Sequence, residues 1–514
     1  MDGNILTMTT AKPHAEAVAI KDGRILRVGT NEEISQLVGQ NTQVIHLRGK
    51  TVVPGFIDAH IHVADFGRLL SWVELDAVKS VEELQLILKK RVEHTPKGRW
   101  IIGRGWDQTC FSEQRFPTRF DLDMVSPDNP VIFYHKLGRL CVVNSKALEL
   151  AGVTSETSAP LGGYIDKDEE TGELTGILRE NATGLVWKAV PEPSQEELAE
   201  AAELACRKIV EAGVTSVHWI VLSSAELSVM QKLLARNRLP LRVYVIIPAN
   251  LLEHIANFKT NDTLALRIGG AMIAVDGYLA AKTAALFEPY SDESEASGDM
   301  LCTIDEMAAV ASKILKMNLQ LVLQAMGDRA VDAALTVIER ISEEMQPRRI
   351  RIEHAALLNK ELIDRMKKLG AIVSVQPLVI ASEFSVWSAV ERLGVERARR
   401  LYPLKSLLKS GICVIGGSDC PMEPLNPLMG IQAAVTREFF PEEEITVDEA
   451  LRMYTVDAAY SAGEEKLKGS IEKGKLADLT VLSHDPRKVN SAAIGDISVE
   501  ITIIGGKILF SKIK

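Results

Sequence analysis

Residues 319–354 read LQLVLQAMGDRAVDAALTVIERISEEMQPRRIRIEH and contain, in succession, a predicted β-strand, a predicted helix and a second predicted strand. Leu and Val dominate 319–324, and β-branched isoleucines alternate with charged residues at 349–353; both stretches favour strands. Between them, apolar residues recur at i, i+3 and i+4 spacing. This spacing predicts a helix over 328–345 with an apolar face of Val331, Ala334, Leu335, Ile338 and Ile341. A strand, a helix and a strand in this order form a parallel βα unit.

The same alternation extends from about residue 194 to residue 417 and predicts a series of βα units. A second clear helix covers 360–369. An eighth strand is available upstream at 56–59, inside TVVPGFIDAHIH, and eight parallel strands with outer helices close a (β/α)8 TIM barrel of the α/β class. The seven downstream strands are expected at 214–218, 241–247, 266–275, 319–324, 349–353, 371–375 and 412–416.

The spacing of the strands predicts three parts in the chain. About 150 residues separate the first strand from the second, which is too long for one loop, so we expect an α/β insertion domain over the barrel mouth. Both ends of the chain show apolar alternation broken by DG and GG turns, and we expect them to pair in one composite β-sandwich. The predicted limits are 1–52 and 465–514 for the sandwich, 53–65 and 176–464 for the barrel, and 66–175 for the insertion.

Composition narrows the function classes. The 514 residues carry 59 Lys and Arg against 69 Asp and Glu, a net charge of −10, which disfavours nucleic acid and anionic membranes as partners. Six scattered cysteines without a CxxC pair indicate reduced thiols, and no apolar run reaches the roughly 18 residues of a membrane span. We therefore expect a cytoplasmic protein with a small-molecule substrate. Exposed sheet edges make a homo-oligomer one of the expected states.

Reactive side chains fall at the C-terminal ends of the predicted strands, where a barrel of this kind has its active site. In His60-Ile61-His62, period-two alternation points both imidazoles to one side, where they can bind one divalent metal. His354 ends the sixth strand and can supply a third nitrogen. Asp419 follows the eighth strand, and its carboxylate can bind the metal and take a proton from water. The alternatives are hydrogen-bonded core histidines and a helix N-cap aspartate.

Several motifs together resemble the amidohydrolase superfamily and, within it, amidohydrolase family 3, which includes N-substituted formamide deformylases. The resemblance runs nearly end to end, through DGRILRVG, VVPGFIDAHIH, GWDQTCFSEQRFPTRFDLD, GILRENA, VDGYLAAKTAALFEPYSD, QAMGDRAVDAAL, RIEHA, GGSDCPMEPLNP and GSIEKGKLADLTVL. It implies a distorted TIM barrel with a composite β-sandwich, and hydrolysis of a C–N bond by metal-activated water. It also implies that His60, His62 and His354 bind the metal and that Asp419 is both ligand and proton shuttle.

The sequence departs from the family pattern at three positions. The pattern has a lysine, often carboxylated to bridge two metals, where this chain has Met272, and a histidine where it has Gln324. Neither a thioether nor a neutral amide replaces those ligands. We therefore expect one divalent ion, preferably zinc, rather than two. Glu180 either fills a further ligand position or is a structural carboxylate, and His218 either fills one or forms hydrogen bonds inside the barrel. Arg139, where the insertion usually has Gly-His, changes the expected substrate wall.

Two classes of function remain from the sequence. The first is a metal-dependent amidohydrolase that cleaves an amide, formamide or cyclic imide with a mononuclear site and Asp419 as the catalytic residue. The alternative is a degenerate barrel that binds a ligand, or catalyses a non-hydrolytic reaction, without a standard binuclear centre. Lys136 and Arg139 either bind an anionic group on the substrate or form a basic pair on the surface. We assign substrate contacts to Trp106, Asp107, Arg139, Gln324 and Asp276.

Overall fold

The computed structural model describes residues 1–258, 260, 262–344 and 349–513 and contains two compact units. The barrel unit comprises Met1–Gly67 and Leu198–Lys514, and the inserted unit comprises Arg68–Glu197. Each unit has its own sheets and its own hydrophobic core. Of the helices in the described part of the chain, none combines the length and the apolar character needed to cross a membrane.

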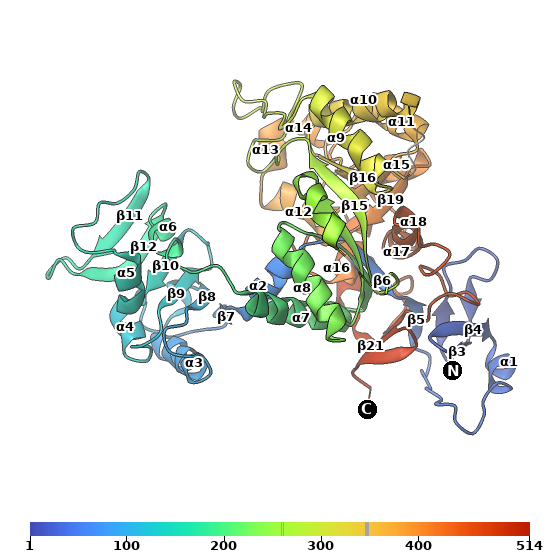
Figure 1. Cartoon of the computed structure of the whole chain (residues 1–514), viewed down its shortest axis with the longest axis horizontal. Coiled ribbons are helices and arrows are strands. Elements are labelled where there is room, and N and C mark those ends of the chain that lie inside the picture. The colour runs from blue at the N-terminus through green and yellow to red at the C-terminus, as the bar shows by residue number, and fades with distance from the viewer. Residues whose placement is uncertain (259, 261, 345–348, 514) are drawn as a thin grey trace. The chain divides into compact units, whose positions relative to one another are not determined.

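Eight parallel strands of the described residues form the nearly closed sheet of a TIM barrel (Figure 1), which confirms the predicted barrel fold. Every neighbouring pair in the ladder is parallel, in the order β19-β18-β17-β16-β15-β14-β13-β6. Each observed strand overlaps one of the predicted strands. The strands are β6 (Phe56–Ile61), β13 (Val214–Ile220), β14 (Arg242–Pro248), β15 (Leu266–Ala274), β16 (Gln320–Ala325), β17 (Arg351–His354), β18 (Ile372–Val375) and β19 (Cys413–Gly416).

Helices connect most of these strands. The predicted helix at 328–345 corresponds to α10 (Asp328–Glu344), and its predicted last residue, Met345, lies outside the described residues. The predicted helix at 360–369 is α11 (Lys360–Leu369), which begins after the N-cap Asn359 and ends at Gly370, whose φ of 64° suits glycine. The others are α2 (Val63–Ser71), α7 (Gln195–Glu211), α8 (Ser224–Ala235), α9 (Ile304–Lys316), α12 (Pro377–Ser385), α13 (Ala389–Leu393), α14 (Val395–Ala398), α15 (Leu404–Lys409), α16 (Pro427–Val435), α17 (Val447–Met453) and α18 (Val456–Ser461).

The barrel closes where the end of β6 meets the segment that follows β19. Asp419 N donates to the carbonyl of His60 (2.7 Å), and His62 N donates to the carbonyl of Cys420 (3.0 Å). The buried carboxylate of Asp58 accepts from both sides of this seam, from His60 N at 3.1 Å and Ser418 N at 3.0 Å. Gly417 permits the close approach, because a Cβ there would lie 2.5 Å from His60 N. The seam therefore brings the first and last strands of the barrel together at their C-terminal ends.

The two ends of the chain meet in a six-stranded sheet with the order β2-β1-β5-β20-β21-β22, where the blue and red parts of the ribbon lie together in Figure 1. β5 (Thr51–Pro54) pairs antiparallel with β20 (Leu479–Leu482). A separate hairpin consists of β3 (Ala17–Lys21) and β4 (Arg24–Gly29). Its Ile25 belongs to the hydrophobic cluster that the six-stranded sheet also contributes to. The remaining strands are β1 (Asn4–Leu6), β2 (His14–Ala15), β21 (Val499–Ile504) and β22 (Lys507–Ser511), and α1 (Asn31–Ser35) follows the hairpin.

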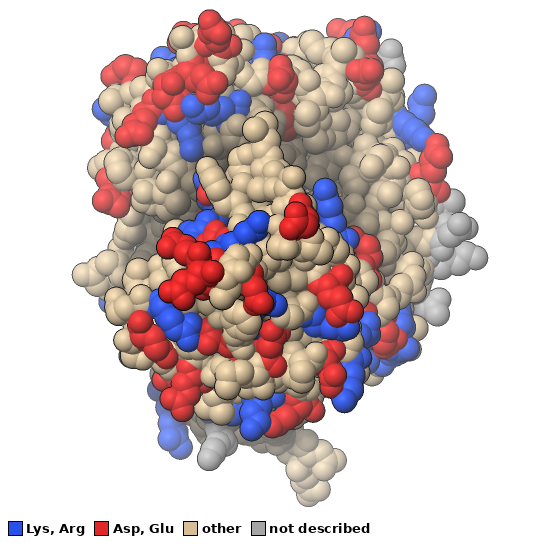
Figure 2. Space-filling view, turned by 90° about the vertical axis from the view of Figure 1, so that its left-hand side faces the viewer, with Lys and Arg blue, Asp and Glu red and all other residues tan. Residues whose placement is uncertain are grey.

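The inserted unit is a mixed sheet with helices. Its strands have the order β11-β12-β10-β9-β8-β7, and its helices include α3 (Val81–Glu93), which is N-capped by Ser80. Figure 2 shows acidic and basic side chains intermixed on one face of the molecule. Within the inserted unit, several charged side chains are paired, such as Arg115 with Asp121 at 2.7 Å. The other elements are β7 (Val73–Glu74), β8 (Ile101–Trp106), β9 (Val131–His135), β10 (Leu140–Val143), β11 (Gly163–Lys167), β12 (Leu174–Glu180), α4 (Arg119–Asp123), α5 (Ser145–Ala151) and α6 (Thr183–Trp187).

Candidate metal centre

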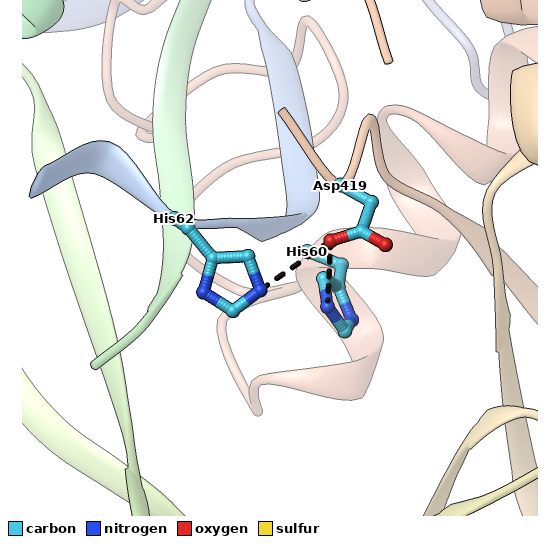
Figure 3. A group of neighbouring side chains, drawn as sticks. All are labelled: His60, His62 and Asp419. Carbon is cyan, nitrogen blue, oxygen red and sulfur yellow. Dashed lines mark ion pairs between the residues drawn. The ribbon is translucent and has the colours of Figure 1, made fainter. Parts of the chain in front are cut away.

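Two histidines and one aspartate converge at the barrel seam (Figure 3). His60 Nε2 lies 3.4 Å and His62 Nε2 lies 3.3 Å from Asp419 Oδ1. One potential ligand atom from each residue lies within 4.8 Å of the others, and among the described residues this is the one such group of three or more His, Cys, Asp or Glu side chains. We name these residues, together with His354, the barrel cluster. Two imidazole nitrogens and a carboxylate oxygen at this spacing are a donor set that suits a divalent transition metal.

The ring of His60 is oriented by a buried carboxylate on β17. His60 Nδ1 lies 2.8 Å from Glu353 Oε2, and both side chains are almost completely buried. Because an ionised carboxylate can only accept, Nδ1 must carry the hydrogen of this bond. The lone pair that a metal needs is therefore on Nε2, which is the nitrogen that faces Asp419.

His354 has a comparable partner. Its Nδ1 donates to Gln376 Oε1 at 2.8 Å, which again places the free lone pair on Nε2. The His354 ring lies 5.3 Å from the His60 ring, measured between centroids. His354 and Asp419 both have left-handed backbone conformations, with φ of 65° and 55°. Such non-glycine conformations are costly and concentrate at functional sites, which is consistent with a role for both residues in the site.

The electrostatics of the barrel cluster favour a cation. Burial alone would lower the pKa of His60, but the carboxylates of Asp419 and Glu353 raise it to about 10. Burial alone would raise the pKa of Asp419, but the neighbouring imidazoles hold it well below its usual range. Glu353 is likewise kept ionised against burial, with a pKa of about 2, chiefly by Arg351 and His60. Positive charge, whether a proton or a metal ion, is thus stabilised between the two carboxylates.

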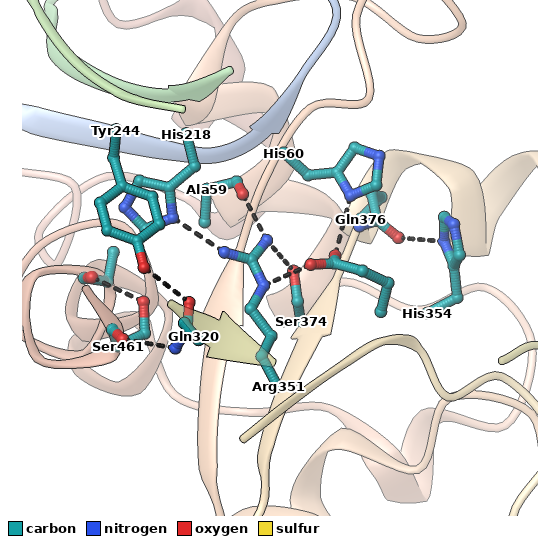
Figure 4. A network of polar contacts seen from close by, with 12 residues as sticks. Ala59, His60, His218, Tyr244, Gln320, Arg351, His354, Ser374, Gln376 and Ser461 are labelled. Atoms are coloured by element: carbon teal, nitrogen blue, oxygen red, sulfur yellow. Dashed lines mark hydrogen bonds and ion pairs between the residues drawn. The ribbon is translucent and has the colours of Figure 1, made fainter. Parts of the chain in front are cut away.

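His218 is close to this network but hydrogen-bonded in the opposite way (Figure 4). Arg351 Nη1 lies 2.8 Å from His218 Nδ1, and a guanidinium can only donate, so Nδ1 is the acceptor. Burial, followed by the charge of Arg351, lowers the pKa of His218 well below its usual value, so the ring is neutral. Its Nε2 therefore carries the hydrogen, and neither nitrogen has a lone pair for a metal. These contacts favour a hydrogen-bonding role for His218 inside the barrel over a role as a metal ligand.

Two of the three residues that depart from the family pattern, Met272 and Gln324, lie in the barrel unit. Met272 packs against an apolar cluster of Ile220, Tyr244, Ile246, Val322 and Ala462. Gln324 is buried. Burial raises the pKa of Tyr278, and the Gln324 side chain lies close enough to the Tyr278 hydroxyl to oppose that shift. The ring of Tyr278 in turn lies 6.3 Å from that of His354. Gln324 therefore lies near an aromatic side chain that is itself beside the barrel cluster.

Asp276, which we predicted to contact substrate, is engaged by the backbone. Its carboxylate accepts from the amides of Ala285, Met326 and Gly327, each at 2.9 Å. Burial raises its pKa to about 6, and these hydrogen bonds oppose that shift. Its observed contacts tie the loop after β15 to the loop after β16.

The observed surroundings of Trp106 differ from those expected of a residue that binds substrate. Its side chain has no exposed surface and packs against Phe111 and Phe116 in the core of the inserted unit. Its indole N–H donates to the carbonyl of Phe133 at 2.9 Å. Trp106 is therefore a core residue of this unit, because its ring packs against aromatic side chains and its N–H has a hydrogen-bond acceptor inside the unit.

The remaining residues of the inserted unit that we predicted to contact substrate are charged, and each lies close to a side chain of opposite charge. Asp107 Oδ2 lies 2.8 Å from Lys136 Nζ. Arg139 is 79% exposed at its side chain and lies 3.8 Å from Glu180, which is itself exposed at the end of β12. Glu180 does not belong to the group of ligand atoms at the barrel seam. Because both cations already face carboxylates, the basic pair that indicated an anionic substrate is largely neutralised.

Sequence reasoning missed the residues that orient the histidines. Glu353 and Arg351 contact the histidines of the barrel through side chains that the motif search did not single out. A signal was present in RIRIEHA, where Arg351 and Glu353 alternate with isoleucines on a predicted buried strand. Charged residues at alternate positions of such a strand must lie inside the barrel and need partners there.

Eight parallel strands with histidines and an aspartate gathered at their C-terminal ends define a TIM-barrel protein with a metal-type site. The sequence model of the amidohydrolase family matches residues 43–510, and the chain belongs to this family.

Individual relatives cover the chain nearly completely. It is 32% identical to YtcJ of Bacillus subtilis, with 99% of this chain and 98% of the relative aligned. It is 27% identical to the N-substituted formamide deformylase of Arthrobacter pascens, with 100% and 98% aligned. The crystal structure of an uncharacterized metal-dependent hydrolase from Pyrococcus furiosus superimposes with a TM-score of 0.77 at 33% identity and covers 95% of this chain and 99% of its own.

Proposed function

We propose that the chain is a metal-dependent hydrolase that cleaves a C–N bond of an amide, a formamide or a cyclic imide in a small molecule. The observation that carries this proposal is the convergence of His60 Nε2, His62 Nε2 and Asp419 Oδ1 at the seam of the barrel. Membership of the amidohydrolase family supports it, and so does the similarity to a metal-dependent hydrolase and to a formamide deformylase.

His60, His62, His354 and Asp419 would hold the metal, and we propose that one ion binds, preferably zinc. Three imidazoles and a carboxylate are a common zinc ligand set. The hydrogen bonds of His60 and His354 direct the Nε2 lone pairs away from Glu353 and Gln376. His62 Nδ1 is buried and has no hydrogen-bond partner among the described residues, so that ring is held less tightly than the other two. A single ion is supported by Met272 and Gln324, whose side chains face apolar or aromatic neighbours.

The reaction requires one proton transfer that the chain itself can perform. A divalent ion, when bound, activates water and polarises the scissile carbonyl. Asp419 directs Oδ1 towards the histidines, which leaves Oδ2 to accept a proton from the attacking water and deliver it to the leaving nitrogen. The low pKa of Asp419 keeps this carboxylate ionised at neutral pH. Glu353 and Gln376 hold the rings of His60 and His354 so that the reacting groups keep their geometry.

Metal analysis combined with activity assays tests the proposal. The purified protein, dialysed mildly, is expected to contain about one equivalent of zinc, iron or manganese and to hydrolyse members of a panel of N-formyl amines, N-acyl amides and cyclic imides. Asp419→Asn should abolish turnover. Well under one equivalent of metal, with no activity restored by added metal, would contradict the proposal.

The second candidate, a barrel without hydrolytic activity, is favoured by Met272 and Gln324 alone. The double substitution Met272→Lys with Gln324→His separates the two. If wild type does not hydrolyse the panel and the double variant gains both metal and turnover, the degenerate barrel is the better description. If wild type already turns over an amide, that alternative fails.

A further inference from the structure

Arg351 is a fully buried cation in the interior of the barrel (Figure 4). It extends from β17 and forms an ion pair with Glu353 on the same strand. Its Nη2 donates to Ser374 Oγ on β18 at 2.9 Å and to the carbonyl of Ala59 on β6. Its Nη1 donates to His218 Nδ1 on β13 at 2.8 Å. Burying a charge costs several kcal/mol unless its partners compensate, and here one guanidinium has partners on four strands.

The contacts of Arg351 determine which nitrogen carries hydrogen in two histidines. Glu353, which Arg351 holds, accepts from His60 Nδ1, so His60 presents Nε2 as its ligand atom. His218 accepts from Arg351 at Nδ1, so its Nε2 must be protonated. An ammonium group could not make these contacts together, because only a planar guanidinium offers five donors in a fixed fork.

We propose that Arg351 is a positioning residue that makes His60 a metal ligand and withholds His218 from the metal. This inference rests on the proposed function and deepens it, because it explains why the centre holds one ion although a fourth histidine lies in the barrel interior. Arg351 touches neither substrate nor metal in this account. It acts through Glu353 on one side and through direct donation to His218 on the other.

The first test measures tautomers in the metal-free protein. Ring ¹⁵N chemical shifts of selectively labelled histidine should show a pyridine-type Nδ1 and a protonated Nε2 for His218, and His218→Asn assigns the signals. Arg351→Met alone would leave Glu353 as an unpaired buried charge, so the test uses Arg351→Met with Glu353→Gln. In that double variant, a pyridine-type Nε2 should appear at His218. A protonated Nδ1 in wild type, or an unchanged tautomer in the double variant, would overturn the inference.

The second test measures metal binding. His218→Asn retains an acceptor for Arg351 and should keep the wild-type number of ions and the wild-type zinc affinity, whereas His354→Asn should lose both. The double variant Arg351→Met/Glu353→Gln should bind zinc about 10- to 100-fold more weakly and change the visible spectrum of the cobalt-substituted protein.

A matched control separates positioning from general stability. Arg242 and Asp478 form another buried ion pair of the barrel unit, at 2.6 Å, away from the barrel cluster. Arg242→Met/Asp478→Asn should lower the melting temperature and leave zinc affinity and the cobalt spectrum unchanged. A loss of affinity in His218→Asn equal to that in His354→Asn would overturn the inference. If wild type binds no metal, the proposed function fails, and the tautomer measurement still decides the role of Arg351.

Discussion

The barrel unit and the inserted unit each place histidine beside aspartate. In the barrel cluster, His60 and His62 approach Asp419 to 3.4 and 3.3 Å. In the inserted unit, His135 Nε2 lies 3.8 Å from Asp107 Oδ1, and Lys136 lies 2.8 Å from the other oxygen of the same carboxylate. Residue types alone do not separate these two groups. We name Asp107, His135 and Lys136 the insert cluster.

The difference lies in what the second nitrogen of each histidine contacts. His60 donates from Nδ1 to Glu353, which frees Nε2 for a metal. His135 accepts at Nδ1 from the backbone N–H of Leu137, at 3.1 Å, so its neutral ring carries hydrogen on Nε2. The insert cluster therefore presents a hydrogen and an ammonium group to its aspartate, whereas the barrel cluster presents lone pairs and room for a cation. Hydrogen bonding, more than composition, distinguishes a ligand histidine from a structural one.

The largest expected effect comes from removing the aspartate charge in each cluster. Asp419→Asn should weaken zinc binding by more than about 100-fold, because it removes a ligand and the charge that stabilises a cation there. Asp107→Asn should leave the number of bound ions and the zinc affinity unchanged. Competition with a chromophoric chelator measures both. Equal losses in the two variants would mean that the insert cluster also holds metal, and the comparison would fail.

A buried carboxyl with one oxygen that lacks a hydrogen-bond partner among the described residues gives the next largest effect. Glu383 on α12 is 1% exposed, and its Oε2 has no hydrogen-bond partner among the described residues. Burial raises its pKa from 4.5 to about 7, which Arg392 offsets only in part. Tyr290 and Tyr402 lie close enough for the Glu383 charge to raise their pKa values, although burial contributes more. Unlike Asp419, this carboxyl has no imidazole beside it to keep it ionised.

The pH dependence follows from that contrast. Because the folded state binds the Glu383 proton more tightly than the unfolded state, wild type loses stability as pH rises from about 4.5 to about 7. Glu383→Gln should match wild type at pH 4.5 and exceed its stability by roughly 1–3 kcal/mol at pH 8. Unfolding midpoints at the two pH values measure the difference, with the exposed Glu149→Gln as the control that should show none. A wild type that is more stable than Glu383→Gln at pH 8 would show that the carboxylate has a partner.

The barrel was predictable from the sequence because its determinants are local and repeated. One continuous stretch of the chain repeats the same features: apolar runs such as 319–324, amphipathic helices such as 360–369, and the end of each strand. Strand limits differ by one or two residues, as at β17, where the predicted 349–353 is observed as Arg351–His354.

Of the candidate site, the sequence predicts only the side chains that carry the reactive atoms. Alternation in His60-Ile61-His62 and the position of Asp419 after the last strand are properties of neighbouring residues. The tautomer of His218 depends on Arg351, which is more than 100 positions away in the chain. The burial of Trp106 depends on how the aromatic side chains of its own unit pack together. A single sequence does not show which distant residues come into contact. Ligand and non-ligand histidines therefore could not be separated by motif alone.

The partner of His354 offers a smaller effect on the barrel cluster. Gln376→Ala removes the oxygen that accepts from His354 Nδ1, and zinc affinity should fall by about 10-fold because the ring loses its orientation. Gln376→Glu retains an acceptor and should restore at least wild-type affinity. If both variants bind zinc equally weakly, the amide contributes by packing, and orientation of the ring through Nδ1 does not explain the site.

The smallest effect is expected from removing the cation of the insert cluster. A hydrogen bond from Lys136 is the largest cause that holds the pKa of Asp107 below its usual range, so Lys136→Met should raise that pKa while the bonds from Thr109 still lower it. The change is measurable by carboxyl ¹³C shifts during a pH titration. No zinc should bind to the insert cluster in this variant, because His135 Nδ1 still accepts from Leu137. A second bound ion in Lys136→Met would show that the ammonium charge, and not the tautomer of His135, separates the two clusters.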